Sequence, residues 1–400
     1  MNTRSEMECR PTCALPVYSH DRGGFSSLRG ARVLIYWPHG LGDLVGLGYV
    51  LPLLDRSNRY WITRFGDHYT ALMEDNRFVT PVYVGRVSAP DGPYNGVSEK
   101  NGHFGLDYTQ LDGSPRYLRV PPTISTICSR EKIDAVLWTS YPEVFGREPF
   151  PYHSKPRNLI RHLAPAEAGS QLSCGRPLKN CISFRVCRWV TRWVESRLQN
   201  YTGYGHRKLC IIARNGFTSV SKNWGHHWRE EFPEESAREG EECREFMRLM
   251  IRKDPGWMFL SMEDRLFSGD HTLHEPELNA FSFAQVFGPT GAHDLPFAIV
   301  LKALVNLASL AIGVPTGPYH LCAANSNLPT VGVWIEHMPN WYDEPKSASI
   351  HLLGRTVIER LASAPGNFIS RAGLYYRTIA APSRAIPGTL AFAAVEQLLW

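Results

Sequence analysis

Hydrophobic residues along this chain fall into short uninterrupted runs and longer segments with helical spacing. Short apolar runs bounded by glycine, proline or polar residues are typical of strands buried in a parallel sheet. They predict strands at residues 32–37, 60–63, 80–84, 133–138, 209–213, 257–261, 281–287, 307–312 and 329–334. Helices are predicted at residues 44–54, 67–75, 181–198, 233–253, 295–306 (capped by Asp294) and 388–399. Strands that alternate with helices predict an α/β fold with two open sheets.

The order of these elements predicts two α/β domains. We expect an N-terminal arm, a first Rossmann-like domain, a linker, a second Rossmann-like domain and a C-terminal helix. Their predicted bounds are 1–30, 31–190, 191–207, 208–385 and 386–400. In the first domain, residues 86–122 are rich in Gly, Pro, Asn, Asp and Tyr, and their hydrophobic residues show little periodicity. We expect a long insertion near the mouth of a site, since loops of this length are usually functional or mobile.

A glycine-rich turn follows the first predicted strand of the first domain. Its sequence is Pro38-His39-Gly40-Leu41-Gly42-Asp43. The glycines allow a tight turn and leave room for a substrate. Asp43 is expected at the carboxyl end of the strand, the edge where ligands gather in open α/β sheets. Two roles stay open for its carboxylate, a general base and a helix N-cap, and the pattern alone favours the cap.

The second domain contains a similar break between an apolar strand and a helix. The strand at 307–312 ends in the turn Pro315-Thr316-Gly317-Pro318, and a small, apolar, helix-like segment follows. Free N–H groups and the dipole make a helix N-terminus suitable for phosphate. Thr316 and His320 are four residues apart and are expected on one side of the first turn. A strand–turn–helix corner with a buried histidine explains the pattern equally well.

Two further polar segments follow strands of the second domain. Lys222 lies in a polar loop and is a candidate phosphate ligand, although a single lysine is more often a solvated surface group. Glu263 and Asp264 follow the strand at 257–261 and are candidates for binding a ribose hydroxyl, as acidic residues do in dinucleotide folds. Capping of the next helix is the alternative role for these two carboxylates.

Composition and motifs exclude several classes of protein. The charged fraction of 20% is ordinary for a globular protein, and the formal charge of +5 on 400 residues permits an acidic ligand but does not favour nucleic acid. The chain lacks G-x-G-x-x-G, G-x-x-x-x-G-K and G-x-S-x-G motifs, so simple dehydrogenase, P-loop and hydrolase functions are not expected. The nine cysteines are scattered without a pairing pattern, which favours reduced thiols. Since no signal peptide is apparent either, we expect a cytoplasmic protein.

The sequence predicts no metal site. The cluster His271, His274 and Glu275 lacks the i, i+4 and H-E-x-x-H spacings that place ligands on one helical face. No Asp-x-Asp pair is present to hold a metal on a nucleotide diphosphate. We therefore expect no cofactor.

The predicted helix at 181–198 is basic, aromatic and amphipathic. It carries four arginines together with Trp189 and Trp193. A helix packed on the sheet with its arginines in water is the favoured interpretation. Peripheral contact with the inner face of a membrane is the alternative.

Three segments together resemble glycosyltransferase family 9, the bacterial heptosyltransferases. Residues 32–43 resemble the family's opening strand and its small-residue turn that ends in Gly-Asp. Ala213-Arg214-Asn215-Gly216 with Lys222-Asn223-Trp224 resembles the start of the family's second domain and its Lys-x-Trp. Residues 313–324, with the strand at 329–331, are similar to the family's Asp-Thr-Gly-Pro-x-His-Leu motif. Residues 86–205 show little resemblance.

The resemblance implies a GT-B fold, with two Rossmann-like domains facing across a cleft. It implies an inverting transfer of a sugar, usually heptose from ADP-heptose, to a hydroxyl acceptor in a glycoconjugate, protein or natural product, without a metal. Asp43 would be the base, and His39, Gly40 and Gly42 would form the turn on the acceptor side. The donor would be bound by the following residues: Lys222, Glu263, Thr316, Gly317, Pro318 and His320.

One departure from the family pattern affects the donor. Pro315 replaces the family's aspartate, which usually contacts the donor sugar, and it also removes a backbone donor from the turn. A GDP-, UDP- or dTDP-sugar is therefore an alternative donor. A binding protein without catalysis is a further alternative, although the presence of Asp43, Lys222 and His320 together argues against it.

Overall fold

The structure, a computed structural model, describes part of the chain in many segments. The described residues are 15–19, 28–37, 41–63, 70–82, 97–98, 103–104, 116–118, 122–138, 179–202, 207–214, 224, 233–262, 274–288, 295–335, 349–363, 377–381 and 386–400. None of the helices among them is long and apolar enough to cross a membrane.

Contacts between Cα atoms divide the chain into two units. Unit 1 consists of Met1–His39, Val50–Arg147 and Arg157–Gly175, and unit 2 of Gly40–Tyr49, Glu148–Pro156 and Arg176–Trp400. Most of helix α1 (Leu41–Val50) therefore clusters with unit 2, although the strand before it belongs to unit 1. The predicted linker, 191–207, includes much of a helix of unit 2, α6 (Arg188–Thr202).

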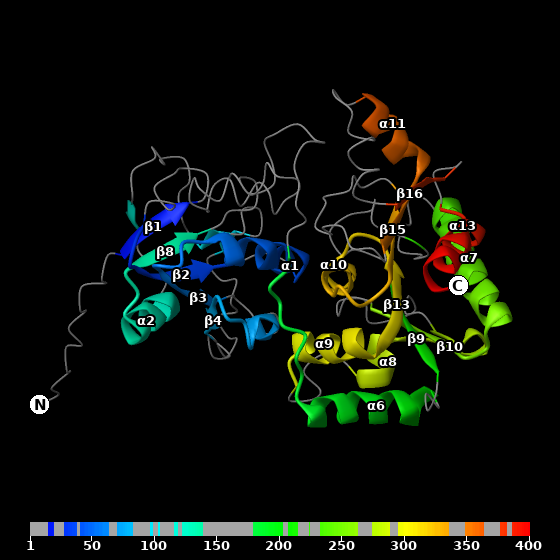
Figure 1. Ribbon diagram of the computed structural model, residues 1–400, viewed down its shortest axis with the longest axis horizontal. Coiled ribbons are helices and arrows are strands. Elements are labelled where there is room, and N and C mark those ends of the chain that lie inside the picture. Colours follow the sequence, from blue (N-terminus) through cyan, green and yellow to red (C-terminus); the bar gives the residue numbers. More distant parts are fainter. Residues whose placement is uncertain are drawn as a thin grey trace, which may run out of the picture. The chain divides into compact units, whose positions relative to one another are not determined.

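Unit 1 is built on a six-stranded sheet with the order β4-β3-β2-β8-β1-β7 (Figure 1). All neighbouring strands are parallel except β1 and β7. The strands are β1 (Leu15–Ser19), β2 (Arg32–Tyr36), β3 (Arg59–Thr63), β4 (Thr80–Pro81), β7 (Arg116–Leu118) and β8 (Ala135–Trp138). The short helices η2 (Leu51–Leu53) and η3 (Thr70–Met73) and the helix α2 (Pro122–Glu131) connect them. The predicted strands that begin at 32, 60, 80 and 133 are confirmed.

Two segments of unit 1 contain strands that the sequence did not predict. In the N-terminal arm, Leu15–Ser19 forms β1 between β8 and β7. In the insertion at 86–122, Arg116–Leu118 forms β7 and a two-stranded ribbon joins β5 (Val97–Ser98) to β6 (His103–Phe104). Strands β5, β6 and β7 are too short to give a periodic pattern, and β1 pairs with strands about a hundred residues away in the sequence.

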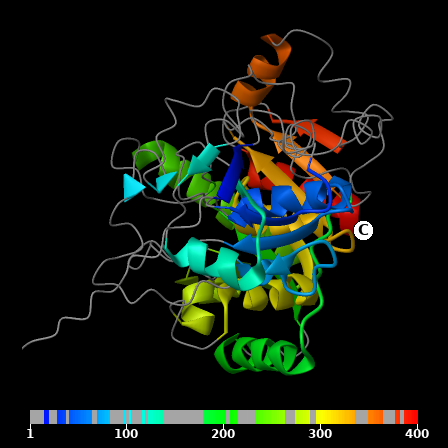
Figure 2. The same cartoon turned by 90° about the vertical axis from the view of Figure 1, so that its left-hand side faces the viewer.

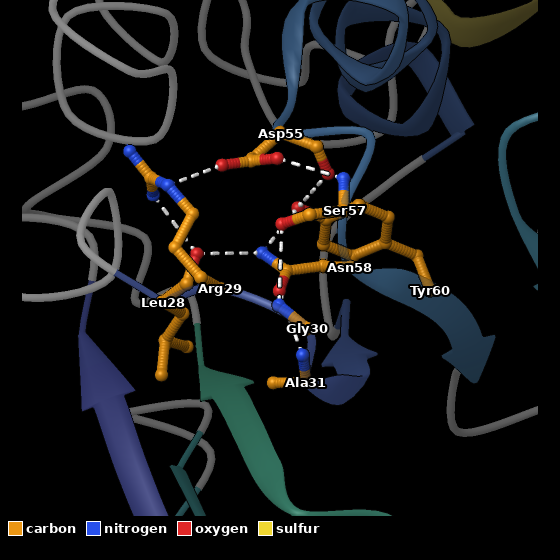
Figure 3. A network of polar contacts seen from close by, with 8 residues as sticks. All are labelled: Leu28, Arg29, Gly30, Ala31, Asp55, Ser57, Asn58 and Tyr60. Atoms are coloured by element: carbon orange, nitrogen blue, oxygen red, sulfur yellow. Dashed lines mark hydrogen bonds and ion pairs between the residues drawn. The ribbon is translucent and has the colours of Figure 1, made fainter.

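A buried asparagine holds the start of β2 against the turn before β3 (Figure 3). The Asn58 side chain is only 6% exposed. Its Oδ1 accepts from the backbone N–H of Ala31 at 2.9 Å, and its Nδ2 donates to the carbonyl of Leu28 at 3.0 Å and to the Tyr60 hydroxyl at 3.1 Å. An Arg29–Asp55 ion pair of 2.7 Å lies beside it. Burial is the main reason that the pKa of Tyr60 is raised.

Unit 2 contains an eight-stranded sheet with the order β11-β12-β10-β9-β13-β14-β15-β16. Only the β11–β12 pair is antiparallel. The strands are β9 (Lys208–Ala213), β10 (Trp257–Ser261), β11 (His274–Glu275), β12 (Ala280–Ser282), β13 (Ala308–Gly313), β14 (Thr330–Trp334), β15 (Ser349–Leu353) and β16 (Arg377–Ala380). From β12 to β15 the order is that of a doubly wound Rossmann sheet, in which the first strand, β9, lies next to the fourth, β13.

Helices cover both faces of this sheet (Figure 1). They are α6, α7 (Pro233–Lys253), η6 (Pro276–Leu278), α8 (Phe283–Phe287), α9 (Phe297–Leu307), α10 (Gly317–Ala324), α11 (Arg355–Ser363) and α13 (Gly388–Leu399). On one face, Phe246 of α7 and Val395 of α13 pack against Ile212 and Ile312 of the central strands. On the other face, Ala213 packs with Tyr319 of α10. Alternate residues of the central strands thus contribute to opposite cores, as expected for a sheet buried on both sides.

The structure corrects three element predictions for unit 2. The strand predicted at 281–287 ends at Ser282, and helix α8 follows, because Ser282 and Gln285 form a reciprocal capping box. Asp294 is not the cap of the next helix, since Pro296 occupies that position. The helix predicted from residue 181 begins at Arg188. Its first part stays non-helical, with the Cys181 N–H bonded to the carbonyl of Gly48 at 2.9 Å.

Candidate functional site

Two central strands of unit 2, β9 and β13, end at the same edge of the sheet. Strands β9 and β13 pair in parallel up to Ala213 and Gly313, and the Val314 N–H donates to the Ala213 carbonyl at 2.8 Å. A side chain on Gly313 would overlap that carbonyl, so only glycine allows the approach. Because the chain order reverses between these strands, their carboxyl ends form a topological switch point, where open α/β sheets bind ligands.

Helix α10 begins at this edge, as the turn sequence predicts. Thr316 is its N-cap, with extended backbone, and Thr316 Oγ1 accepts from the Tyr319 N–H at 3.5 Å. Proline at the start of a helix removes a donor that would otherwise lack a partner, and Pro318 occupies this position. Thr316 and His320 are 8% and 3% exposed. Because Oγ1 accepts a hydrogen bond from its own helix, the Thr316 hydroxyl can donate its proton in a hydrogen bond to a ligand.

The first turn of α1 lies directly against the first turn of α10. A Cβ built on Gly317 would lie 2.7 Å from Leu41 Cβ and 3.1 Å from the backbone nitrogen of Gly42. A Cβ built on Gly42 would lie 2.9 Å from His320 Cδ2. The structure therefore brings together Gly42, Gly317 and His320, which the sequence places nearly 300 residues apart. Two helix N-termini that meet combine their unpaired N–H groups and their positive dipole ends, which suits an anionic ligand.

The polar segment before α6 holds α1 in this position. Asn180 Nδ2 donates to the carbonyl of Val45 at 2.8 Å, and the Cys181 N–H donates to the carbonyl of Gly48. Asn180 Oδ1 in turn accepts from the Ile182 N–H at 2.9 Å. A side chain on Gly48 would overlap Asn180, so the glycine allows the close contact. These bonds fix α1 to unit 2 and thereby fix Gly42 beside α10.

Several predicted site residues lie outside the described residues. They are His39, Gly40, Lys222 and Glu263. The backbone of Asp43 is described, and it is the third residue of α1. Asp43 therefore lies inside the first helical turn and not at the N-cap, in the place where the helix dipole favours a carboxylate.

Trp224, the last residue of the Lys-x-Trp segment, is fully buried and anchored on two sides. Its N–H donates to the Arg214 carbonyl at 2.6 Å, and its indole Nε1 donates to the carbonyl of Ile386 at 3.3 Å. The tryptophan thereby ties its segment to the carboxyl end of β9. Arg214, only 6% exposed, directly follows β9 at this edge of the sheet and was not among the predicted site residues. Its signal in the sequence is an arginine directly after a buried strand.

A buried polar network lies under α10. Trp334 Nε1 donates to His351 Nδ1 at 2.8 Å, and the Ser349 hydroxyl lies 3.5 Å from His351 Nε2. An indole N–H is only a donor, so His351 Nδ1 is the acceptor of this bond. A Cβ built on Gly332 would lie 2.6 Å from the Tyr319 hydroxyl and 2.7 Å from His351 Nδ1. The network thus fills the space between the sheet and α10 with polar groups.

The described residues contain no group of three His, Cys, Asp or Glu side chains placed to hold a metal. Glu275, from the acidic and histidine cluster noted in the sequence, instead accepts from Arg244 Nε at 2.6 Å. His271 of that cluster lies outside the described residues.

Two α/β units, the second with a Rossmann strand order, are the architecture of GT-B-like proteins. The sequence matches no protein-family model and no curated protein. The structure is similar to a glycosyl transferase of family 9 from Veillonella parvula, with 13% identity, a TM-score of 0.52 and coverage of 93% of this chain and 98% of that one.

It is also similar to the ADP-heptose lipopolysaccharide heptosyltransferase II of Escherichia coli, with 10% identity, a TM-score of 0.51 and coverage of 92% and 98%. Both similarities extend over nearly the whole of each chain. They confirm the predicted GT-B fold and the resemblance to family 9 at the level of the fold.

Proposed function

We propose that this protein is a glycosyltransferase that moves a sugar from a nucleotide diphosphate to a hydroxyl acceptor. The proposed donor is ADP-heptose, and the proposed reaction inverts the anomeric centre and needs no metal. The acceptor is a bacterial glycoconjugate, a protein or a natural product, and the proposed location is the cytoplasm. The observation that carries the proposal is the contact between the first turns of α1 and α10, with Gly42 beside Gly317 and His320.

This contact supports the proposal because it joins the two motifs with complementary roles. In the family that the sequence resembles, the Gly-Asp turn supplies the base and the Thr-Gly-Pro turn receives the donor. Here Asp43 directly follows Gly42, and Gly317 is the first residue of α10. A structure in which these turns lay on separate elements far apart would have argued against a single site.

The proposed chemistry follows from these groups. Asp43 takes the proton of the acceptor hydroxyl, whose oxygen forms a bond to the anomeric carbon while the bond from that carbon to the diphosphate oxygen breaks. The leaving diphosphate gains negative charge, and Lys222 and the N-terminus of α10 stabilise it electrostatically. A positioned base contributes on the order of 10²–10⁴-fold to such a rate.

A different nucleotide sugar is the second candidate donor. The motivating observation is Pro315, which is buried at the end of β13 where the family has an aspartate. Without that carboxylate, contacts to the donor sugar differ, and a GDP-, UDP- or dTDP-sugar becomes a reasonable substrate. Catalysis on any of these donors would use the same base and the same helix N-terminus.

The first test is nucleotide binding. The melting temperature of the purified protein is measured with ADP, GDP, UDP and dTDP in turn. A ligand at about 100 times its Kd stabilises the folded state by roughly 2.7 kcal/mol, so the true nucleotide should raise the melting temperature clearly. A response to GDP or UDP without a response to ADP would exclude ADP-heptose as donor.

The second test separates catalysis from binding. The Asp43→Asn variant should bind the same nucleotide with unchanged affinity, while release of ADP from ADP-heptose in the presence of acceptor falls by at least about 10²-fold. Glu359→Gln, a change of an exposed carboxylate on α11, is the matched control and should retain full activity. Full activity in Asp43→Asn would remove this residue as the base.

A further inference from the structure

The inner side of helix α6 is already occupied by unit 2. Val190, Val194 and Leu198 are spaced by four residues, and each is at most 2% exposed. This stripe faces α8 and α9, with which α6 is in contact. Trp193 packs beside it on Phe287 of α8, with 5.8 Å between the ring centroids. The apolar side of the helix is thus satisfied within the protein.

The opposite side of α6 exposes a tryptophan between arginines. Helical spacing places Arg188, Trp189 and Arg192 on the side away from the buried stripe, and all three are exposed. Trp189 is 61% exposed, the largest exposure among the large hydrophobic residues described. Figures 1 and 2 show α6 as the outermost helix on this side of unit 2, beyond α8 and α9. Most of this side chain is therefore in contact with solvent and not with the core of the domain.

The segment that contains this surface carries an excess of positive charge. Residues 179–201 carry five exposed basic side chains and one acidic residue, Glu195. The basic residues are Lys179, Arg185, Arg188, Arg192 and Arg197. Among the described residues none of these five forms an ion pair, whereas Arg244 and Arg248 of α7 both bind glutamates. The helices beneath, α8 and α9, contain no acidic residue.

We propose that Lys179, Arg185, Arg188, Trp189 and Arg192, here called the α6 surface, dock unit 2 on an anionic phospholipid bilayer. Arginine and lysine side chains match the charge of the lipid headgroups, and each adds to binding near a charged membrane. An exposed tryptophan is favoured at the level of the lipid headgroups, because its ring is apolar and its N–H group can stay hydrated there. The buried stripe excludes insertion of α6 itself, so the contact is peripheral.

The indole favours a lipid surface over nucleic acid. Contacts to a nucleic-acid backbone use arginine, lysine and polar groups, and an aromatic ring contributes mainly where unpaired bases stack on it. The whole chain has a charge of only +5 on 400 residues, so the positive charge is local to one helix and not a general basic surface. The inference does not depend on the proposed sugar transfer.

The test is co-sedimentation of the full chain with vesicles of phosphatidylcholine, with or without phosphatidylglycerol. Binding should require the anionic lipid and should weaken as salt rises, because exposed charges are screened. The variant Arg185→Gln/Arg188→Gln/Arg192→Gln should bind roughly 100-fold more weakly, at about five-fold for each charge removed. The control Arg130→Gln/Arg248→Gln/Arg355→Gln removes three charges elsewhere and should change binding much less.

The tryptophan has its own matched control. Trp189→Ala should weaken vesicle binding, while Trp400→Ala, a change of a 53% exposed tryptophan on the other side of the sheet, should not. These side chains are exposed or, at Arg248, partly exposed, so unchanged melting temperatures will confirm that the variants fold. Equal binding of the Arg variants and the original protein, or no binding to anionic vesicles at all, would overturn the proposal. Binding to single-stranded DNA instead, lost in the Arg185/Arg188/Arg192 variant, would assign the α6 surface to nucleic acid.

Discussion

Gly42 and Gly317 lie so close that a methyl group added to Gly317 would reach within 3.1 Å of the Gly42 nitrogen and 2.7 Å of Leu41 Cβ. The Gly42 nitrogen is a backbone atom and the Leu41 Cβ is bonded directly to the backbone, so neither atom can move unless α1 moves. Alanine is intrinsically the better helix former by up to about 1 kcal/mol. Overpacking of a close contact costs about 1–3 kcal/mol, so the steric cost should exceed this gain.

Gly317→Ala should therefore lower the free energy of unfolding by about 1–2 kcal/mol and also weaken nucleotide binding, since α1 and α10 are forced apart. Urea denaturation and nucleotide-induced shifts of the melting temperature measure the two effects. Unchanged stability would show that the two helices do not pack as described.

Gly42→Ala provides a contrast, because its added methyl group meets a side-chain atom, His320 Cδ2, at 2.9 Å. Gly42→Ala should lower the free energy of unfolding less in a His320→Ala background than in the original protein. The expected interaction energy between the two substitutions is about 0.5–3 kcal/mol. Gly317→Ala should show no such relief from His320→Ala. A double-mutant cycle by urea denaturation measures this, and additive effects for the Gly42 pair would contradict the contact.

Thr316 should stabilise α10 through its hydroxyl. Removal of an N-cap side chain costs about 0.5–2 kcal/mol, and the long 3.5 Å bond to the Tyr319 N–H places Thr316→Ala near the lower end. Thr316→Ser keeps the cap oxygen and should retain the stability. If the hydroxyl also donates to the donor phosphate, Thr316→Ala should weaken nucleotide binding further than its small stability loss explains. Equal stability of the two variants would rule out the cap.

The sequence predicts the central elements of unit 2 well because each is locally determined. Strand β13 is a continuous apolar run, and the start of α10 has its own cap residue and proline. The α8 segment was predicted wrongly as strand, since its apolar residues fit both periods and the decisive feature is the Ser282–Gln285 capping box. Strand β1 was missed because its partner strands lie about a hundred residues away.

The meeting of Gly42 with Gly317 and His320 was suggested only by family resemblance. No local pattern states that the helix after β2 packs on a helix nearly 300 residues later in the chain. Hydrogen bonds from Asn180 and Cys181 hold α1 beside α10. The sequence around these two residues does not predict such bonds. The motifs thus predict which residues carry the proposed chemistry, whereas the assembly of the candidate site depends on contacts between residues distant in the chain.

Asn58 should be among the most sensitive polar residues of unit 1. Its side chain satisfies the Ala31 N–H and the Leu28 carbonyl in a nearly buried position (Figure 3). A buried group left without its partner costs about 1–3 kcal/mol, so Asn58→Ala should lower the free energy of unfolding by about 2 kcal/mol or more. Ser57→Ala loses an exposed bond from the Gly30 N–H and a hydrogen bond to the partly exposed Asp55 carboxylate, and it should stay within about 0.5 kcal/mol. Urea denaturation of both variants makes the comparison, and similar losses would contradict the network.

Asp254 should make the stability of unit 2 depend on pH in the acid range. The pKa of its carboxyl is lowered below the ordinary 3.8, chiefly by Lys208 Nζ at 2.7 Å and then by the Gly256 N–H at 2.8 Å. Between the lowered value and 3.8 the unfolded chain binds more protons, so stability falls as pH falls through this window and is fully present above it. Both side chains are partly exposed, so the charge pair should contribute at most about 1 kcal/mol and less at high salt.

Asp254→Asn should therefore destabilise the protein slightly at pH 7, and the difference from the original protein should disappear in acid. Lys208→Gln should reduce the same pH dependence, because it removes the largest cause of the lowered pKa while leaving the Gly256 bond in place. Urea midpoints measured from pH 7 down to the acid limit of folding test both variants. A stability difference that persists unchanged below the pKa of Asp254 would show that the effect of the substitution is not electrostatic.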